Sequence, residues 1–317
     1  SESDFVAVIE RVGGASAVRQ SVHAVAVVRA PLKQLEFAEL ALRAPASAVI
    51  ASTDLLCVAL TNGEIDVYST AGEAPLDLIE TIDAFADPSD PSPVTDIALG
   101  GDGTIYVLRR IGDVFALTAL AGPAGIYGAT GHQRDIVTDV GAAGSLAMGK
   151  RGALFFTGAM PDPASAPAIW RFDVATIGTA PERFAPLTAA ALAIDANDLV
   201  YAASDAITGA GPTLVAVTPS GAPAIHSFGR GRNVQRLSFY TSEAIADVQG
   251  HLLAAVGSGD QTTLQSIRLA AGRVASVDVI ASLPARSTFA VGPRGEIYAT
   301  DSSRPVLLMA SRFAPTR

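Results

Sequence analysis

Arginine is the residue type whose placement suggests a function in this sequence. The chain has 317 residues and 22 Lys and Arg, of which only Lys33 and Lys150 are lysines. Seven arginines fall at the ends of predicted strands or in adjoining loops: Arg109, Arg110, Arg230, Arg232, Arg236, Arg286 and Arg304. Guanidinium groups bind carboxylates and phosphates through paired hydrogen bonds, so these arginines predict an anion-binding surface. Aspartates expected on the same surface, such as Asp96 and Asp301, would instead pair with them as ordinary salt bridges.

Two residues are candidates for catalysis: Asp96, at the start of an apolar strand, and His132, in the loop GATGHQRD. The other histidines, His23, His226 and His251, lie far apart, and no pair has the spacing of a zinc site. The sequence contains no Gly-x-Ser-x-Gly, phosphate loop or dinucleotide fingerprint. We therefore predict no metal centre, and neither candidate belongs to a recognisable catalytic motif.

Three other features have structural explanations. Asp195 and Asp198 stand in DAND between two apolar runs, which is typical of a solvated turn. Cys57 is the single cysteine, so no disulfide forms within the chain, and its apolar surroundings indicate a small core residue. Trp170 is the single tryptophan and is expected to pack in the core.

A degenerate repeat must position all these residues. Its clearest copy is Val94–Thr118, which alternates apolar strands with Gly/Asp turns. Related segments are 47–59, 145–157, 191–203, 245–255 and 288–300. Their second strands recur every 45 to 52 residues, measured between Leu56, Tyr106, Phe155, Tyr201, Leu253 and Tyr298. Several strands per repeat at this spacing predict a β-propeller, in which each sheet buries its faces against its neighbours.

The repeat predicts an all-β chain with six blades of four antiparallel strands. Residues 45–317 would form the propeller. Since the last repeat has only three strands, residues 1–44 would supply the strand that closes the ring. The segment Leu35–Arg43 has the composition of a helix but the position of that strand. If FVAVIERV and HAVAVVRA also form a sheet, the alternative is seven blades.

Composition excludes some classes of partner. The formal net charge is −9, which argues against nucleic acid, and no apolar run is long enough for a membrane helix. We expect no signal peptide within the sequence; one removed before residue 1 would make the protein secreted or periplasmic. The oligomeric state is not predicted.

Two segments, ALAIDANDLVYAAS (191–204) and TFAVGPRGEIYATDSS (288–303), resemble the six-bladed propellers of the NHL and gluconolactonase/senescence-marker type. VTDIALGGDGTIYVL (94–108) is similar to both. The resemblance implies lactonase or esterase activity, with a divalent metal such as calcium in the central channel, bound by Glu, Asn and Asp of innermost strands.

That metal site does not transfer to this sequence. Asp96 is the only acid at the predicted position, and the other repeats have Ser47, Leu146, Ala190, Leu237 and Thr288 there. Calcium needs six to eight oxygen ligands, so one carboxylate does not make a site. No cofactor is therefore predicted, and calcium in the channel remains the alternative.

We accordingly expect a non-enzymatic binding propeller that recognises a protein, peptide, glycan or other anionic ligand at the loops around its channel. The alternative is a gluconolactonase-like hydrolase or lyase that acts on a small anionic substrate. In that case Asp96 would act as a base or metal ligand, and the arginines would hold the substrate.

Overall fold

The computed structural model describes residues 35–70, 76–83, 85, 94–120, 133–161, 166–176, 179–205, 211–218, 220–239, 251–270, 272–292 and 294–310. Leu35–Arg317 form one compact unit, which is the unit described below. His132 and the segments FVAVIERV and HAVAVVRA lie outside the described residues.

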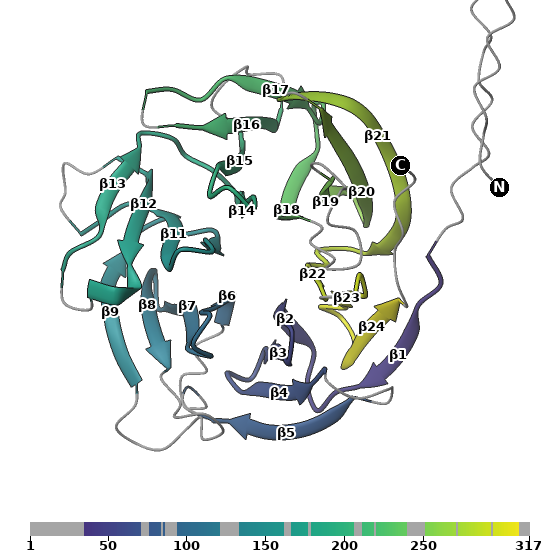
Figure 1. Cartoon of the computed structure of the whole chain (residues 1–317). Helices are drawn as coiled ribbons and strands as arrows, with labels where there is room; N and C mark the ends of the chain where they lie inside the picture. Colours follow the sequence, from purple (N-terminus) through teal and green to yellow (C-terminus); the bar gives the residue numbers. More distant parts are fainter. Residues whose placement is uncertain are drawn as a thin grey trace, which may run out of the picture. The chain divides into compact units, whose positions relative to one another are not determined.

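The described residues form six antiparallel four-stranded sheets arranged as a ring (Figure 1). Blade 1 contains β2 (Ala46–Ala51), β3 (Leu55–Leu60), β4 (Ile65–Ser69) and β5 (Asp77–Ile82); blade 2 contains β6 (Val94–Leu99), β7 (Ile105–Ile111), β8 (Val114–Leu120) and β9 (Gln133–Val140). Blade 3 contains β10 (Leu146–Met148), β11 (Ala153–Gly158), β12 (Ala168–Asp173) and β13 (Glu182–Ala185); blade 4 contains β14 (Ala191–Ile194), β15 (Val200–Ser204), β16 (Thr213–Val217) and β17 (Ala224–Ser227). Blade 5 contains β18 (Asn233–Phe239), β19 (His251–Ser258), β20 (Gln261–Ala270) and β21 (Arg273–Pro284); blade 6 contains β22 (Phe289–Val291), β23 (Ile297–Thr300) and β24 (Val306–Ala310). The predicted six-bladed architecture is confirmed.

An N-terminal strand closes the ring. β1 (Ala38–Ala41) pairs antiparallel with β24, from Ala38 opposite Met309 to Ala41 opposite Val306, and becomes the fourth strand of blade 6. Arg304 strengthens this junction, because its guanidinium contacts Glu39 on β1 at 3.0 Å and Asp301 at 2.7 Å. The open edge of β24 therefore decides the conformation of this segment against its helical composition.

The apolar strands form the ring because successive side chains face different neighbours. On β7, Ile105 and Val107 pack against blade 1, whereas Tyr106 and Leu108 pack against blade 3. All four are buried. A strand buried on both faces is stable only between two other sheets, so the repeat is consistent with a closed ring.

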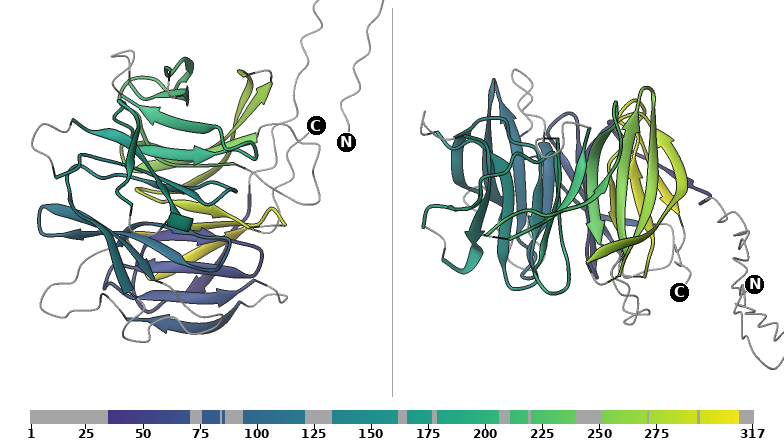
Figure 2. Two further views of the ribbon diagram at one scale, coloured as in Figure 1. Left: turned by 60° about the vertical axis from the view of Figure 1, so that its left-hand side comes forward. Right: turned by 90° about the horizontal axis from the view of Figure 1, so that it is seen from above.

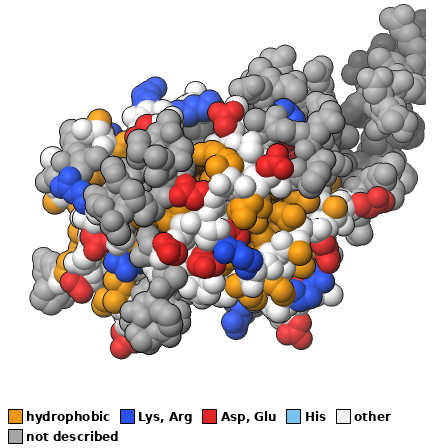
Figure 3. Space-filling view, turned by 90° about the horizontal axis from the view of Figure 1, so that it is seen from below, with side chains coloured by type: hydrophobic (Ala, Val, Ile, Leu, Met, Phe, Trp, Pro, Cys, Tyr) orange, Lys and Arg blue, Asp and Glu red, His pale blue; other side chains and the backbone are white. Residues whose placement is uncertain are grey.

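The innermost strands β2, β6, β10, β14, β18 and β22 surround the centre of the ring (Figure 1), and the region that they surround is called the channel here. The strands run through the thickness of the ring (Figure 2). We call the face where the innermost strands begin the start face, and the face where they end the end face. Figure 3 looks onto the side of the ring that carries β5, where apolar side chains lie among acidic and basic ones; the exposed Leu78 and Ile79 belong to β5.

Helix is almost absent from the described part of the chain. It consists of η1, a 3-10 helix at Val174–Thr176. Within the described residues, no helix has the length and hydropathy of a membrane span.

Candidate functional site

Asp96 and Arg236 occupy equivalent positions in blades 2 and 5, which face each other across the channel (Figure 1). The strand register places these equivalent residues on the six innermost strands and the turns before them: Ala48, Asp96, Ser145, Ala191, Arg236 and Thr288. The sequence alignment was wrong by one residue in four blades, since it placed Leu237 rather than Arg236 opposite Asp96. A β-bulge interrupts the pairing at this level in β2, β6 and β18, so apolar alternation alone does not give the register of these strands.

The two side chains form an ion pair inside the channel. Nη1 of Arg236 donates a hydrogen bond to Oδ1 of Asp96, and the side chains are 9% and 8% exposed. The same carboxylate accepts the backbone N–H groups of Ile97, at 2.8 Å, and Leu146, at 2.7 Å. Asp96 therefore links three blades, and donors occupy both of its oxygens.

This pair leaves one donor unsatisfied. Nε of Arg236 is buried and has no hydrogen-bond partner among the described residues. A buried donor without an acceptor costs about 1–3 kcal/mol. An acceptor brought by a ligand would remove that cost, and Arg236 lines a pocket that could hold one.

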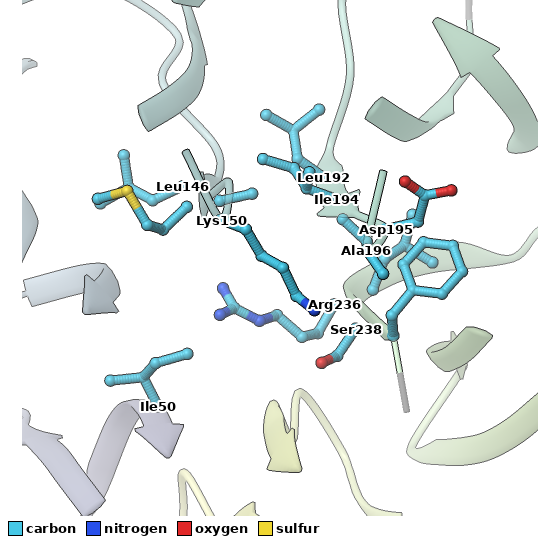
Figure 4. A pocket seen from close by; sticks show the side chains of 14 residues that line it. Ile50, Leu146, Lys150, Leu192, Ile194, Asp195, Ala196, Arg236 and Ser238 are labelled. Carbon is cyan, nitrogen blue, oxygen red and sulfur yellow. The ribbon is translucent and has the colours of Figure 1, made fainter. Parts of the chain in front are cut away.

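The pocket extends from Arg236 toward the end face and has a volume of about 230 Å³. Its walls come from blades 1, 3, 4 and 5, and Figure 4 shows Arg236 extending among them. The lining includes apolar Ile50, Leu146, Met148, Leu192, Ile194 and Phe239 and polar Lys150, Asp195, Arg236 and Ser238. A concave pocket lined by both apolar and polar side chains can hold a small molecule.

Two neighbouring turns carry Lys150 and Asp195 to the pocket. Lys150 lies between β10 and β11, and Asp195 lies between β14 and β15. Asp198 joins these turns: its Oδ1 accepts the N–H of Lys150 at 2.8 Å, and its Oδ2 lies 3.1 Å from Nε of Arg151. The interpretation of DAND as a solvated turn missed these contacts.

The predicted arginine surface is only partly connected to this pocket. All seven arginines lie on the start-face side by topology, but of these only Arg236 lines the pocket. Arg109 lies 3.5 Å from Asp135 and stacks on Phe85, and Arg304 contacts Asp301 and Glu39. Among the described residues, the exposed Arg110, Arg230, Arg232 and Arg286 make no ion pair. Their role in binding stays a prediction.

The described donor set does not fit a divalent metal. No group of three or more His, Cys, Asp or Glu side chains within the described residues is arranged to hold one. In the channel, the guanidinium of Arg236 already occupies the place beside Asp96 where a cation would bind.

Comparisons with known proteins show the fold. No protein family matches the sequence, and no curated protein is significantly similar to it. The chain is similar to the structure of a putative oxidoreductase (glucose dehydrogenase) from Thermus thermophilus, with 16% identity, coverage of 87% of this chain and 99% of that one, and a TM-score of 0.60. The chain is also similar to PQQ-bound aldose sugar dehydrogenase from Streptomyces coelicolor, with 13% identity, coverage of 88% of this chain and 99% of that one, and a TM-score of 0.57. A putative gluconolactonase has 12% identity, coverage of 88% of this chain and 93% of that one, and a TM-score of 0.52.

The class that the fold defines is therefore the six-bladed β-propeller, the architecture that the resemblance to gluconolactonase-type propellers implied. The sugar dehydrogenase structures share this architecture. The same comparisons correct the functional prediction. A non-enzymatic binding propeller was expected, but the similar structures carry the names of sugar dehydrogenases and a gluconolactonase. They favour the alternative, an enzyme.

Proposed function

We propose that the protein is an enzyme, a hydrolase or lyase, that acts on a small anionic substrate derived from a sugar and bound in the channel pocket. The observation that carries this proposal is the buried guanidinium of Arg236, which lines the pocket and has a free Nε donor. A fixed guanidinium can hold a substrate carboxylate, or stabilise the negative charge that forms on an oxygen during the reaction.

The other polar residues have more limited roles in this proposal. Asp96 holds Arg236 and orients it, since its own oxygens already accept hydrogen bonds. Lys150 and Asp195 are the remaining ionisable groups of the described lining and the candidates for proton transfer. Apolar side chains of the lining, such as Leu146 and Leu192, lower the dielectric constant beside these groups, which strengthens electrostatic interactions there. No step in this account needs a metal.

The experiment is a turnover assay with sugar lactones, aldonates and uronates, with and without EDTA. We expect the wild type to convert at least one of these compounds, and EDTA to leave the rate unchanged. Arg236→Met should reduce kcat/KM at least about 100-fold, the loss typical of removing one stabilising donor. Arg171→Gln is the matched control, because it breaks an exposed ion pair with Glu182 on the outer strands of blade 3.

Two results would contradict the proposal. One is a wild type that converts none of the three substrate classes. The other is an Arg236→Met variant that melts as a folded protein and retains wild-type kcat/KM. Inhibition by EDTA that calcium reverses would show instead that a metal takes part, against the described donor set.

A further inference from the structure

Lys150 brings a second positive charge to the pocket from a different blade. It lines the pocket from the turn after β10, and its side chain extends across the channel in the direction of Arg236 (Figure 4). Asp96 neutralises Arg236, whereas the ammonium group of Lys150 makes no ion pair within the described residues. The carboxylate of Asp195 points away from Arg236 in Figure 4, and its Oδ1 accepts the N–H groups of Asn197 and Leu199. Within the described lining, Lys150 is therefore a cationic side chain without a paired carboxylate.

Asp198 fixes the turn that carries Lys150. It accepts the backbone N–H of Lys150 and pairs with the side chain of Arg151, so both of its oxygens hold the neighbouring blade. The contact is close: a Cβ atom added to Gly149 would lie 2.9 Å from Oδ1 of Asp198. Asp198 therefore acts on Lys150 by fixing the position of its backbone, and not through a contact with its ammonium group.

Comparison with the other blades shows that Asp198 is a departure from the repeat. The equivalent residue between the first and second strands is glycine in blades 2, 3 and 6, where Gly103, Gly152 and Gly295 have φ of 84°, 80° and 87°. Asp198 adopts φ of 63° in the same turn. This left-handed conformation favours glycine and costs other residues energy. Blade 4 therefore carries a strained residue in the turn that contacts Lys150.

We infer that Lys150, positioned by Asp198, acts with Arg236 to bind one carboxylate of a monoanionic ligand, such as a sugar acid without a phosphate group. The unpaired Nε of Arg236, a residue that is 7% exposed, points independently to a ligand in the same pocket. One ammonium group without a carboxylate partner matches a monoanion better than a phosphate ester, whose second charge would stay unpaired. The sugar part of the ligand rests on the proposed function.

Calorimetric titration with D-gluconate and 6-phospho-D-gluconate tests this inference on the full chain. We expect the wild type to bind gluconate more tightly than its phosphate. Lys150→Met should weaken gluconate binding about tenfold, the effect of one charge-assisted hydrogen bond, and Lys150→Arg should restore most of it. Asp198→Gly should weaken it about threefold to tenfold, and the relief of the positive φ by glycine should offset part of the stability lost with the contacts to blade 3.

The control is Arg294→Gln, which changes the equivalent turn of blade 6, and it should bind gluconate as the wild type does. The inference would be overturned if the wild type bound 6-phospho-D-gluconate more tightly than gluconate. It would also be overturned if Lys150→Met bound gluconate with wild-type affinity. A wild type that binds no gluconate would overturn it as well. If Arg236→Met abolishes binding while Lys150→Met and Asp198→Gly leave it intact, this inference fails and the proposed function stands. If Arg236→Met also binds normally, both fail.

Discussion

Arg236 and Asp96 connect opposite sides of the ring, because β18 and β6 belong to blades 5 and 2 and their side chains meet inside the channel. They lie 140 residues apart in the sequence. Each is the counter-ion that offsets the desolvation cost of burying the charge of the other. Both the stability of the ring and the charge available to a ligand depend on this contact.

Removing one partner should therefore be costly. Asp96→Ala leaves a buried guanidinium without its carboxylate and should lower the free energy of unfolding by about 3–5 kcal/mol. The double variant with Arg236→Met should cost less than the sum of the two single changes, as expected for coupled residues. Urea denaturation measures all three values. Glu182→Ala is the control, since its exposed pair with Arg171 should be worth less than about 1 kcal/mol. Additive effects of the two channel variants would show that the pair is not coupled.

Removal of β1 should destabilise the ring. Deletion of residues 1–42 exposes the edge of β24 and removes the pair between Glu39 and Arg304. Deletion of residues 1–34 keeps β1 on β24 and keeps this ion pair. If the lost strand contributes about 3 kcal/mol, the melting temperature should fall by about 6–12 °C. Differential scanning calorimetry compares the two deletions. Equal melting temperatures would mean that β1 does not stabilise blade 6.

Cys57 should be unreactive in the folded protein. The residue is fully buried between blades 1 and 2, and burial raises the pKa of its thiol to about 12. Because the thiolate is the reactive form, a thiol reagent such as DTNB should label less than about a tenth of the protein at pH 8. After unfolding in guanidinium chloride, one equivalent should react. Rapid labelling of the native protein would show that this blade interface opens.

His251 should make stability depend on pH. Burial lowers the pKa of this histidine below its ordinary value of 6.5, nearby Arg268 lowers it further, and Asp278 opposes the shift. The unfolded chain then takes up the proton first as pH falls. The neutral, buried form of His251 therefore makes its full contribution to the free energy of unfolding above pH 6.5. This contribution is lost as the pH falls through the lower pKa of the folded state.

The test is urea denaturation between pH 5 and 8 for the wild type and His251→Gln. The variant loses the hydrogen bond of about 3.3 Å with Ser266 at every pH, but its stability should fall less steeply below pH 6.5. His226→Gln is the comparison, because burial also lowers the pKa of His226. Parallel curves for the wild type and His251→Gln would contradict the prediction.

Much of the fold could be predicted because propeller strands depend on local pattern. Alternating apolar residues and recurrent turns such as GGDG and GPRG identify strand pairs without knowledge of long-range contacts. The register was harder to predict, because side chains alternate between the two faces of a strand and an error of one residue moves each assignment to the neighbouring position. Arg236 was recognised as a candidate, and Asp96 as an aspartate that would pair with one of the arginines, but the sequence did not identify them as each other's partners.

The sequence alone determined the all-β class, the six repeats and the need for a closing strand, because short-range alternation and turn chemistry decide these. It also showed that aspartates stand in blade 4 where other repeats have glycine, although not what they contact. Only the tertiary structure decided that Arg236 meets Asp96, that Asp198 holds Lys150, and that these residues share one pocket. Such contacts depend on closure of the ring, which brings together side chains that no local pattern connects.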